Sequence, residues 1–426
     1  ILNFQELIQQ IRLIPEAEYM FKHVLTQEVT YETLLRQNRK NMHGLVGKAI
    51  EELYQDRIEE QVNLLFHHFS LAENWPKAAV YGQQAASKAY KLSQYQDALK
   101  MFEQAKKCLL KLPENPNRQE ALIAMHSDMN WPLHFLGNHD RAWEICQESE
   151  SVARFLENPV PLGKVFYDYA MTSFFKVRYE KAESYYLNVF DQLEGTGEDE
   201  FIYHVKFPLA VTYFSLAQWE KAAALYSEII EISETQNTQA NYRRHYPFLP
   251  YTHSCTHLGY IRALQGHVEE GKTLVDKGHT PHLESIANLP SKAYCTLWHS
   301  TLSALIGENY GALTRAEKVV EIAEKTDSPI LCFLGYAAKG NALMASELYK
   351  EVCGFYEEAL EVIKGTEHRR YLASVYYHLI RSYLELGDIR KAEQYYQDGF
   401  PLVELNPALD APRFDFVRAR LIASSI

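Results

Sequence analysis

A short pattern recurs along most of this chain at a spacing of about forty residues, and this repeat limits the folds that the chain can adopt. An aromatic residue is followed three positions later by a small one at Tyr95, Tyr179 and Trp219. Altered forms of the pattern begin at His139, Val268, Tyr310, Tyr349 and Ile389. From Tyr95 to Val268 the successive steps are 44, 40, 40 and 49 residues. A repeat of this length predicts stacked supersecondary units instead of one closed core.

Each repeat unit has the apolar spacing of two helices. After Trp219, apolar residues recur every three or four positions and charged residues occupy the other face, which is typical of an amphipathic helix. A second periodic stretch precedes each aromatic residue, for example at 207–216 and 376–386, and ends in a turn such as Gly387-Asp388. The small residue is needed where the two helices approach closely, and the aromatic residues fill the space between hairpins. The chain is therefore predicted to be an array of helical hairpins.

Two prolines, Pro132 and Pro208, fall inside the helical patterns. A proline in a helix interior removes a backbone hydrogen bond and clashes with the preceding turn. We therefore expect a kink or a late helix start at each of them.

The repeat resembles the tetratricopeptide repeat (TPR), whose pattern is W-x2-L-G-x2-Y, then A-x3-F, then P. The matching positions are Leu258-Gly259, Leu209-x3-Tyr213, Leu379-x3-Tyr383, Ala98-x3-Phe102, Ala182-x3-Tyr186 and Ala222-x3-Tyr226. The period exceeds the roughly 34 residues of that family, so we expect longer helices or loops. The resemblance implies an all-α fold, a right-handed superhelical solenoid of TPR-like hairpins with a short N-terminal linker or cap. We expect about eight to nine hairpins over 58–402 and a C-terminal capping segment over 403–426.

The first 57 residues do not follow the repeat and carry a second resemblance. The matching segments are Tyr19 to Leu35, Arg39-x3-His43, Ala49-Ile50-Glu51 and, just downstream, Phe66-His67-His68-Phe69. They resemble the joint between the ATPase core and the TPR region of bacterial STAND-type signalling ATPases, many of which also carry a class III adenylate or guanylate cyclase domain. The resemblance implies an upstream ATPase domain in cis and identifies residues 1–57 as the end of an ATPase-associated domain. This chain would then be the regulatory, sensing part, and we expect that it is not an enzyme.

Charge and composition disfavour other classes of protein. The 43 Lys and Arg residues against 55 Asp and Glu give a net charge of −12, which opposes binding to nucleic-acid phosphates. The 6 cysteines form no CxxC motif, which indicates a reducing compartment, and we expect the cytoplasm. The longest apolar stretch, 330–338, is too short to span a membrane. The N-terminus lacks an initiator methionine and the zones of a signal peptide, so we expect a fragment of a longer protein.

The short basic runs are interpreted as solvated faces. They are Arg36-x-x-Arg39-Lys40, Arg243-Arg244, Arg369-Arg370 and Arg413-x4-Arg418-x-Arg420.

The segment from Gly266 to Thr273 satisfies the phosphate-loop pattern G-x4-G-K-[ST] letter for letter. A phosphate loop follows a buried strand and opens a helix, whereas the preceding residues 254–265 have a helical period. Glu269 and Glu270 would repel a nucleotide. We therefore interpret Gly266 as a turn glycine and Gly271 as the small residue of a hairpin, and we expect no nucleotide and no other cofactor.

Histidine and cysteine residues cluster between positions 253 and 299. The cluster contains His253, Cys255, His257, His279, His282, Cys295 and His299. Two histidines four positions apart on a helix can chelate zinc, but two ligands do not make a site and the HExxH motif is missing. We expect groove and surface histidines and neither a catalytic nor a metal site. A zinc-dependent enzyme that uses these histidines is the less favoured alternative.

The resemblance also indicates which residues face a partner, because the first helix of each TPR hairpin lines the groove. The residues that it places there are Trp131, His134, Lys164, Tyr167, Phe174, His204, Phe207, His253, Tyr260, Asn341, Tyr377 and Arg381. Several of them fit equally well as core between hairpins. Aromatic and arginine side chains are the usual anchors of protein interfaces, so we expect a protein or peptide ligand. Self-association also fits, and a small-molecule effector is the alternative ligand.

Overall fold

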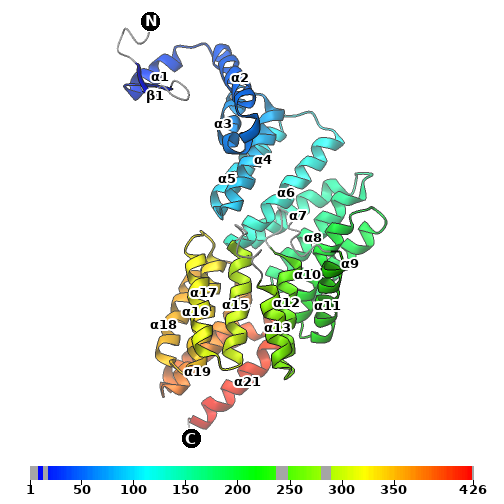
Figure 1. Ribbon diagram of the computed structural model, residues 1–426, viewed down its shortest axis with the longest axis vertical. Helices are drawn as coiled ribbons and strands as arrows, with labels where there is room; N and C mark the ends of the chain where they lie inside the picture. The colour runs from blue at the N-terminus through cyan, green and yellow to red at the C-terminus, as the bar shows by residue number, and fades with distance from the viewer. Residues whose placement is uncertain (1–7, 13–17, 237–247, 280–288, 425–426) are drawn as a thin grey trace. The chain divides into compact units, whose positions relative to one another are not determined.

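The computed structural model describes residues 8–12, 18–236, 248–279 and 289–424 (Figure 1). Within these residues the chain forms 20 α-helices and one two-stranded sheet. Contacts divide the chain into two compact units, one made of residues 1–85 and 101–113 and the other of residues 86–100 and 114–426. None of the helices in the described segments is long and apolar enough to cross a membrane.

The first unit combines a short β-hairpin with a group of helices. Its elements are β1 (Ile8–Arg12), β2 (Glu18–Phe21), α1 (Val24–Glu32), α2 (Arg36–Leu53), the 3-10 turn η2 (Gln55–Arg57), α3 (Ile58–Leu71), the first part of α4 (Trp75–Lys91) and the last part of α5 (Tyr95–Leu109). The strands are antiparallel, with Ile8 opposite Phe21 and Gln10 opposite Tyr19. They are not predicted from the sequence, because strands of 5 and 4 residues are too short to establish a period.

Close packing of α2 against α3 and α4 holds the helices of the first unit together. A Cβ atom at Gly47 of α2 would lie 2.9 Å from the ring of Phe69 on α3, so only glycine fits there. Glu51 of α2 accepts a hydrogen bond of 2.6 Å from the hydroxyl of Tyr81 on α4 and forms an ion pair with Lys77.

The second unit contains the remaining helices, which follow one another as hairpins (Figure 1). The first helices of these hairpins are α6 (Pro116–Leu136), α8 (Pro159–Phe175), α10 (Asp199–Ser215), α12 (Pro250–Leu264), α15 (Leu289–Leu305), α17 (Pro329–Ala345) and α19 (Leu372–Glu385). The second helices are α7 (His139–Ala153), α9 (Tyr179–Leu193), α11 (Trp219–Thr235), α13 (Val268–Gly278), α16 (Asn309–Ala323), α18 (Tyr349–Ile363) and α20 (Ile389–Gly399). The 3-10 turn η3 (Arg369–Tyr371) precedes α19, and η4 (Phe400–Leu405) leads into the last helix, α21 (Pro407–Ser424).

The predicted repeat register is confirmed. Every second helix begins at the residue that opens the aromatic-x-x-small pattern, except α16, which begins one residue before Tyr310. The tyrosines that follow the small residue by four positions, Tyr186 and Tyr226, are among the largest fully buried side chains. These tyrosines therefore pack between helices, as the spacing predicts, whereas Trp219 and Tyr310, which open their repeat units, are exposed.

Of the kink or late helix start predicted at Pro132 and Pro208, the late start is wrong, because α6 and α10 both run through their proline. A kink at each proline stays a prediction. Helix α6 already begins at Pro116, where the side chain of Asn115 accepts a hydrogen bond of 2.9 Å from the Arg118 amide. This cap satisfies one of the free amides of the first turn, and the helix continues past the proline.

Two glycines allow the closest approach within a hairpin. Gly259 of α12 faces Gly271 of α13, and a Cβ atom on either residue would lie 2.6 Å from the carbonyl oxygen of the other. Gly266 forms the turn between the two helices with a φ of 92°, a left-handed conformation that glycine adopts without strain. The segment that matches the phosphate-loop pattern is therefore a hairpin turn followed by a helix, as interpreted from the sequence.

Contacts between residues far apart in the sequence also join the two ends of the hairpin array in the second unit. The carboxylate of Asp327, before α17, accepts hydrogen bonds of 3.0 Å from the amides of Tyr95 and Gln96 in the first turn of α5. The Ser328 hydroxyl donates to the carbonyl of Phe135 on α6 at 2.9 Å. We call the hydrogen bonds made by Asp327, by Ser328 and by Glu367, which is described next, the closure contacts.

The third closure contact lies before η3. Glu367 accepts a hydrogen bond of 2.8 Å from the Asp140 amide at the start of α7, and its own amide donates to the carbonyl of Gly137 at 3.2 Å. Acidic side chains are favoured at helix N-termini, where amides lack partners within the helix. The loops before α17 and α19 therefore cap helices that lie some 200 residues earlier in the chain.

We predict that Gly271→Ala destabilises the protein by about 1–3 kcal/mol, because the new methyl group overlaps the Gly259 carbonyl. Gly354→Ala is the matched control, since nothing lies within 4 Å of a Cβ atom at that exposed position of α18. It should raise the free energy of unfolding by up to about 1 kcal/mol, because alanine favours the helix. Urea unfolding of both variants checks this, and equal stabilities would contradict the close approach of α12 and α13.

We also predict that Asp327→Ala lowers the free energy of unfolding by about 1 kcal/mol, the usual effect of losing a helix cap. Amide hydrogen exchange at Tyr95 and Gln96 should accelerate, because both amides lose their acceptor. Asp327→Asn retains one carbonyl acceptor and should show a smaller change. Unchanged exchange at both amides in the alanine variant would mean that the closure contacts do not form in solution.

Candidate functional site

The first helices of the hairpins share one face in the second unit, and an apolar cavity of about 50 Å³ lies on it. Its lining residues come from α6, α8, α10, the segment before α12, α15, α17 and η3. They are Phe135, Met171, Phe174, Phe175, Phe207, Pro208, Val211, Phe248, Pro290, Tyr294, Ile330, Leu331, Leu334 and Tyr371. We call this site the apolar cavity. Because one water needs roughly 15 Å³, the cavity has room for a few methyl-sized groups.

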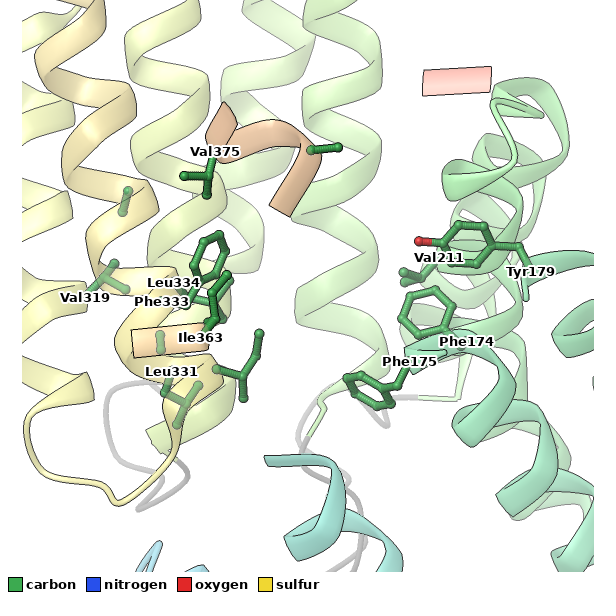
Figure 2. Close-up of a cluster of buried hydrophobic side chains, with 14 of the residues drawn as sticks. Phe174, Phe175, Tyr179, Val211, Val319, Leu331, Phe333, Leu334, Ile363 and Val375 are labelled. Atoms are coloured by element: carbon green, nitrogen blue, oxygen red, sulfur yellow. The ribbon is translucent and has the colours of Figure 1, made fainter. Parts of the chain in front are cut away.

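The wall of the apolar cavity joins helices from both ends of the array. Figure 2 shows Phe174 and Phe175 of α8 with Val211 of α10 in one group, and Leu331 and Leu334 of α17 in another. One of the closure contacts borders the cavity, because Ser328 lies directly before α17 and donates to the carbonyl of a lining residue of α6, Phe135.

Three predicted groove residues pack behind this wall as core side chains. Trp131 meets Phe248 edge-on at a centroid distance of 5.3 Å, and His134 stacks on Phe175 at 4.5 Å. His253 lies 5.2 Å from the ring of Phe207. These side chains support the cavity and present little surface to a ligand.

The two histidines of α12 are held by the backbone. The Nδ1 atom of His253 donates to the Leu249 carbonyl and that of His257 to the His253 carbonyl, each at 2.8 Å. His257 stacks on Tyr294 and lies 4.6 Å from the indole of Trp298. In the part of the chain that the structure describes, no group of three His, Cys, Asp or Glu side chains is arranged to hold a metal ion.

A second group of predicted groove residues gathers around Tyr377 on α19. The guanidinium groups of Arg381 and of Arg413, on α21, lie 5.9 and 5.8 Å from the centre of the Tyr377 ring. The group also contains Asn341, whose Oδ1 accepts a hydrogen bond of 2.8 Å from Tyr356. Tyr356 in turn stacks on His378, the neighbour of Tyr377, at 5.1 Å.

Tyr260 and Trp298 connect this group to the apolar cavity. Their rings are 4.9 Å apart, and Trp298 lies 6.4 Å from Tyr294, which lines the cavity. Burial raises the pKa of Tyr260, and the cation of Arg413 opposes that shift, so the charge of Arg413 reaches α12 as well as α19. We call the whole group the arginine basin: Tyr260, Trp298, Asn341, Tyr377, Arg381 and Arg413.

The structure thus separates the predicted groove residues by burial. The buried ones are Trp131, His134, Tyr167, Phe174, His204, Phe207 and His253, and the half-buried ones are Lys164, Tyr260, Asn341, Tyr377 and Arg381. Phe174 and Phe207 line the apolar cavity, and four of the half-buried residues, Tyr260, Asn341, Tyr377 and Arg381, belong to the arginine basin. Lys164, Tyr167 and His204 belong to neither. Contact of these residues with a partner stays a prediction.

Sequence reasoning misses several residues of the two sites. They are Phe175, Val211, Phe248, Tyr294, Trp298 and Arg413. Tyr294 and Trp298 carry a usable signal, because two aromatic residues four positions apart share one face of a helix. Arg413 is interpreted from the sequence as part of a solvated run, and its side chain is 44% exposed, yet its guanidinium group lies over Tyr377. His282, Arg243-Arg244 and the first seven residues lie outside the described residues.

No protein-family model and no curated protein matches the sequence. Solved structures do match. A chain of the APC/C hetero-tetramer Cut9–Hcn1 superposes with a TM-score of 0.50 at 12% identity, over 83% of this chain and 59% of that one. The present chain therefore has the all-α fold of a TPR-like solenoid. A Rap protein complexed with Competence and Sporulation Factor (TM-score 0.46, 14% identity, 80% of each chain) and yeast Tom70 (0.45, 12%, 95% of this chain and 92% of that one) are also similar.

The buried histidines make the stability depend on pH. Burial lowers the pKa of His134 to about 3, with a further contribution from His368, and it lowers the pKa of His253 and of His368 to about 4. An unfolded histidine binds a proton below a pKa of about 6.5, so the unfolded state takes up protons that the folded state excludes. Each histidine therefore lowers the free energy of unfolding as pH falls from about 6.5 towards its folded pKa.

We predict that each of these histidines costs roughly 2 kcal/mol of stability between pH 7.5 and pH 5. Asp168 acts in the opposite sense, since burial raises the pKa of its carboxyl to about 7 and this group favours folding more as pH falls. The histidine contribution is therefore measured as a difference: His134→Phe should flatten the pH dependence of urea unfolding relative to the parent chain. Identical pH profiles for the two proteins would contradict a buried, neutral His134.

Proposed function

We propose that this chain is a non-catalytic protein-interaction module that binds a peptide or protein partner along the face formed by the first helices. The apolar cavity carries the proposal, because all of its lining side chains are apolar or aromatic. An apolar side chain of a partner that enters the cavity leaves water and fills unoccupied space, and both effects favour binding. Buried aromatic anchors in such pockets carry most of the energy of protein interfaces.

The chemistry of the face also favours binding over catalysis. A catalytic site needs a nucleophile, an acid or a base near the position of the substrate, whereas the side chains around the cavity are aromatic and aliphatic. The His253 ring is buried behind the wall, and burial lowers its pKa.

A finer part of the proposal concerns the protein to which the chain belongs. We propose that it is the sensing arm of a STAND-type signalling ATPase, with residues 1–57 as the end of the ATPase-associated region, 58–402 as the array and 403–426 as its cap. A ligand that prefers one state of the array would shift the equilibrium of the attached ATPase by no more than its difference in affinity for the two states. The resemblance of residues 19–51 supports this part.

A small apolar effector is the second candidate ligand, and the small volume of the cavity favours it over a large cofactor. A zinc enzyme built on His253 and His257 is less favoured, because no group of three His, Cys, Asp or Glu side chains in the described part of the chain is arranged to hold a metal ion. Metal analysis of the purified chain tests the zinc hypothesis directly. Stoichiometric zinc that is lost in His257→Ala would restore it.

We predict that Val211→Phe abolishes binding of peptides selected on the chain from a random displayed library. The added ring occupies the apolar cavity, and the variant should be at least as stable as the parent, because it fills a void. Leu187→Phe, on the exposed side of α9, is the matched control and should bind as the parent does. Isothermal titration measures both affinities.

Two results would contradict this function. If the library yields no peptide that binds the parent chain, the face is not a peptide site. If Val211→Phe and Leu187→Phe bind a selected peptide equally well, the apolar cavity is not the place where it binds.

A further inference from the structure

A further cavity, of about 370 Å³, lies between the two helices of the α10–α11 hairpin. We call it the polar cavity. Its volume is within the usual range of small-molecule sites, roughly 300–1,000 Å³. The residues that line it differ from those of the apolar cavity. They include Asp199, Glu200, Ile202 and Tyr203 of α10, Ile232 of α11, and Gln236 directly after α11.

Two side-chain contacts show how the helices are aligned around the polar cavity. The ammonium group of Lys206 pairs with Glu228 at 2.6 Å, and the hydroxyl of Tyr203 is hydrogen-bonded to that of Ser233. Both contacts fit one antiparallel register, in which the start of α10 lies opposite the end of α11. The carboxylate of Asp199 therefore stands at the exposed end of the cavity, and the Lys206–Glu228 pair stands about 10 Å further along α10.

The oxygen atoms at the exposed end of the polar cavity are hydrogen-bond acceptors. The Ser233 hydroxyl donates to the Ile229 carbonyl at 2.7 Å, so its oxygen is the acceptor for the proton of Tyr203. Burial raises the pKa of Tyr203, so the hydroxyl keeps this proton at neutral pH and its own oxygen can still accept. The carboxylates of Asp199 and Glu200 only accept. A ligand that matches this end must therefore donate.

The charges of the polar cavity favour a cation. Its lining includes two carboxylates and one ammonium group, that of Lys206, which is already paired with Glu228. The buried ring of His204 lies 3.9 Å from the Glu200 carboxylate. The last carbonyl groups of α11 add partial negative charge at the same end. The total charge of −12 also attracts cations from solution.

An organic cation fits the polar cavity better than a metal ion. Over residues 8–12, 18–236, 248–279 and 289–424, no group of three His, Cys, Asp or Glu side chains is arranged to hold a metal. The cavity is also larger than a single ion requires, and Ile202 and Ile232 give it apolar walls. A primary ammonium group has three hydrogen-bond donors and no acceptor, and an attached methylene chain gains from burial against isoleucine.

We propose that the polar cavity binds a primary alkylammonium group. Its nitrogen donates to the carboxylates of Asp199 and Glu200 and to the oxygen of Tyr203, and its methylene chain lies against Ile202 and Ile232. Asp199 and Tyr203 are four positions apart on α10 and so share one face of the helix. This ligand site is additional to the peptide face and does not depend on the proposed function.

The test titrates three small probes into the full chain by isothermal titration. Pentylamine carries the ammonium group, 1-pentanol is its neutral counterpart, and Nα-acetyl-lysine methylamide presents the same group on a lysine side chain. Pentylamine should bind about tenfold or more tightly than 1-pentanol. The lysine derivative should bind as tightly as pentylamine if the natural source is a lysine of a partner, and more weakly if the source is a free amine.

Variants locate the binding site. Asp199→Asn should weaken the binding of pentylamine about fivefold or more and leave 1-pentanol unaffected, and asparagine is well tolerated at helix starts. Asp191→Asn, an exposed residue of α9 with the same change of charge, is the matched control and should bind as the parent does. Ile232→Phe fills the polar cavity, keeps both carboxylates and should abolish the binding of pentylamine.

Several outcomes would overturn the proposal. Equal binding of pentylamine and 1-pentanol, or no binding of pentylamine, would show that the polar cavity does not recognise an ammonium group. Displacement of pentylamine by an equal concentration of magnesium chloride would mean that the amine only screens the acidic surface.

The proposal and the proposed function can fail separately. Val211→Phe should leave pentylamine binding unchanged, and Ile232→Phe should leave the binding of library-selected peptides unchanged. If Val211→Phe abolishes the binding of pentylamine, the amine occupies the apolar cavity and the alkylammonium site is wrong, whereas the peptide experiment stands as before.

Discussion

The close approach of paired helices at small residues is the constraint on which the rest of this structure depends. Gly259 and Gly271 bring α12 and α13 so near that a single methyl group would meet a carbonyl oxygen. Alanine serves the same purpose in other hairpins, as with Ala182 and Ala222, both fully buried. Because each pair is narrow, the larger side chains are placed between hairpins and on the face of the first helices. The apolar cavity and the arginine basin are two parts of that face.

The two sites differ in how they use burial. Around the apolar cavity, most side chains are buried and His253 behind the wall is neutral at pH 7, so the wall contributes contact area without charge. In the arginine basin, half-buried cations are held next to rings and only partly neutralised by carboxylates.

The repeat makes much of this fold predictable, because one register determines where every second helix begins. The aromatic-x-x-small pattern locates α7, α9 and α11 at their first residue. The prolines show the limit of local rules: Pro132 lies within α6 because a cap at Asn115 starts the helix upstream. The β-hairpin of the first unit is too short to produce a period.

The sites are less predictable than the fold, because periodicity shows which face of a helix is apolar and not which neighbour will cover it. Phe174 and Phe207 line the cavity, whereas Trp131 and His134, which the sequence assigns to the same groove, pack against Phe248 and Phe175. Arg413 joins the basin only because α21 packs against α19, a contact between helices that follow different patterns. Such placements depend on tertiary contacts that have no counterpart in the repeat.

The closure contacts have a consequence for how the molecule folds. In most repeat arrays each unit touches only its neighbours, so folding can begin anywhere and local opening spreads gradually. Here Asp327 and Glu367 bond to helices 232 and 227 residues away, and these bonds form only after the intervening hairpins are in place. They raise the mean sequence separation of contacts, which slows the final step of folding and couples the ends of the array. The second unit should therefore unfold more like a globular domain than like a string of independent repeats.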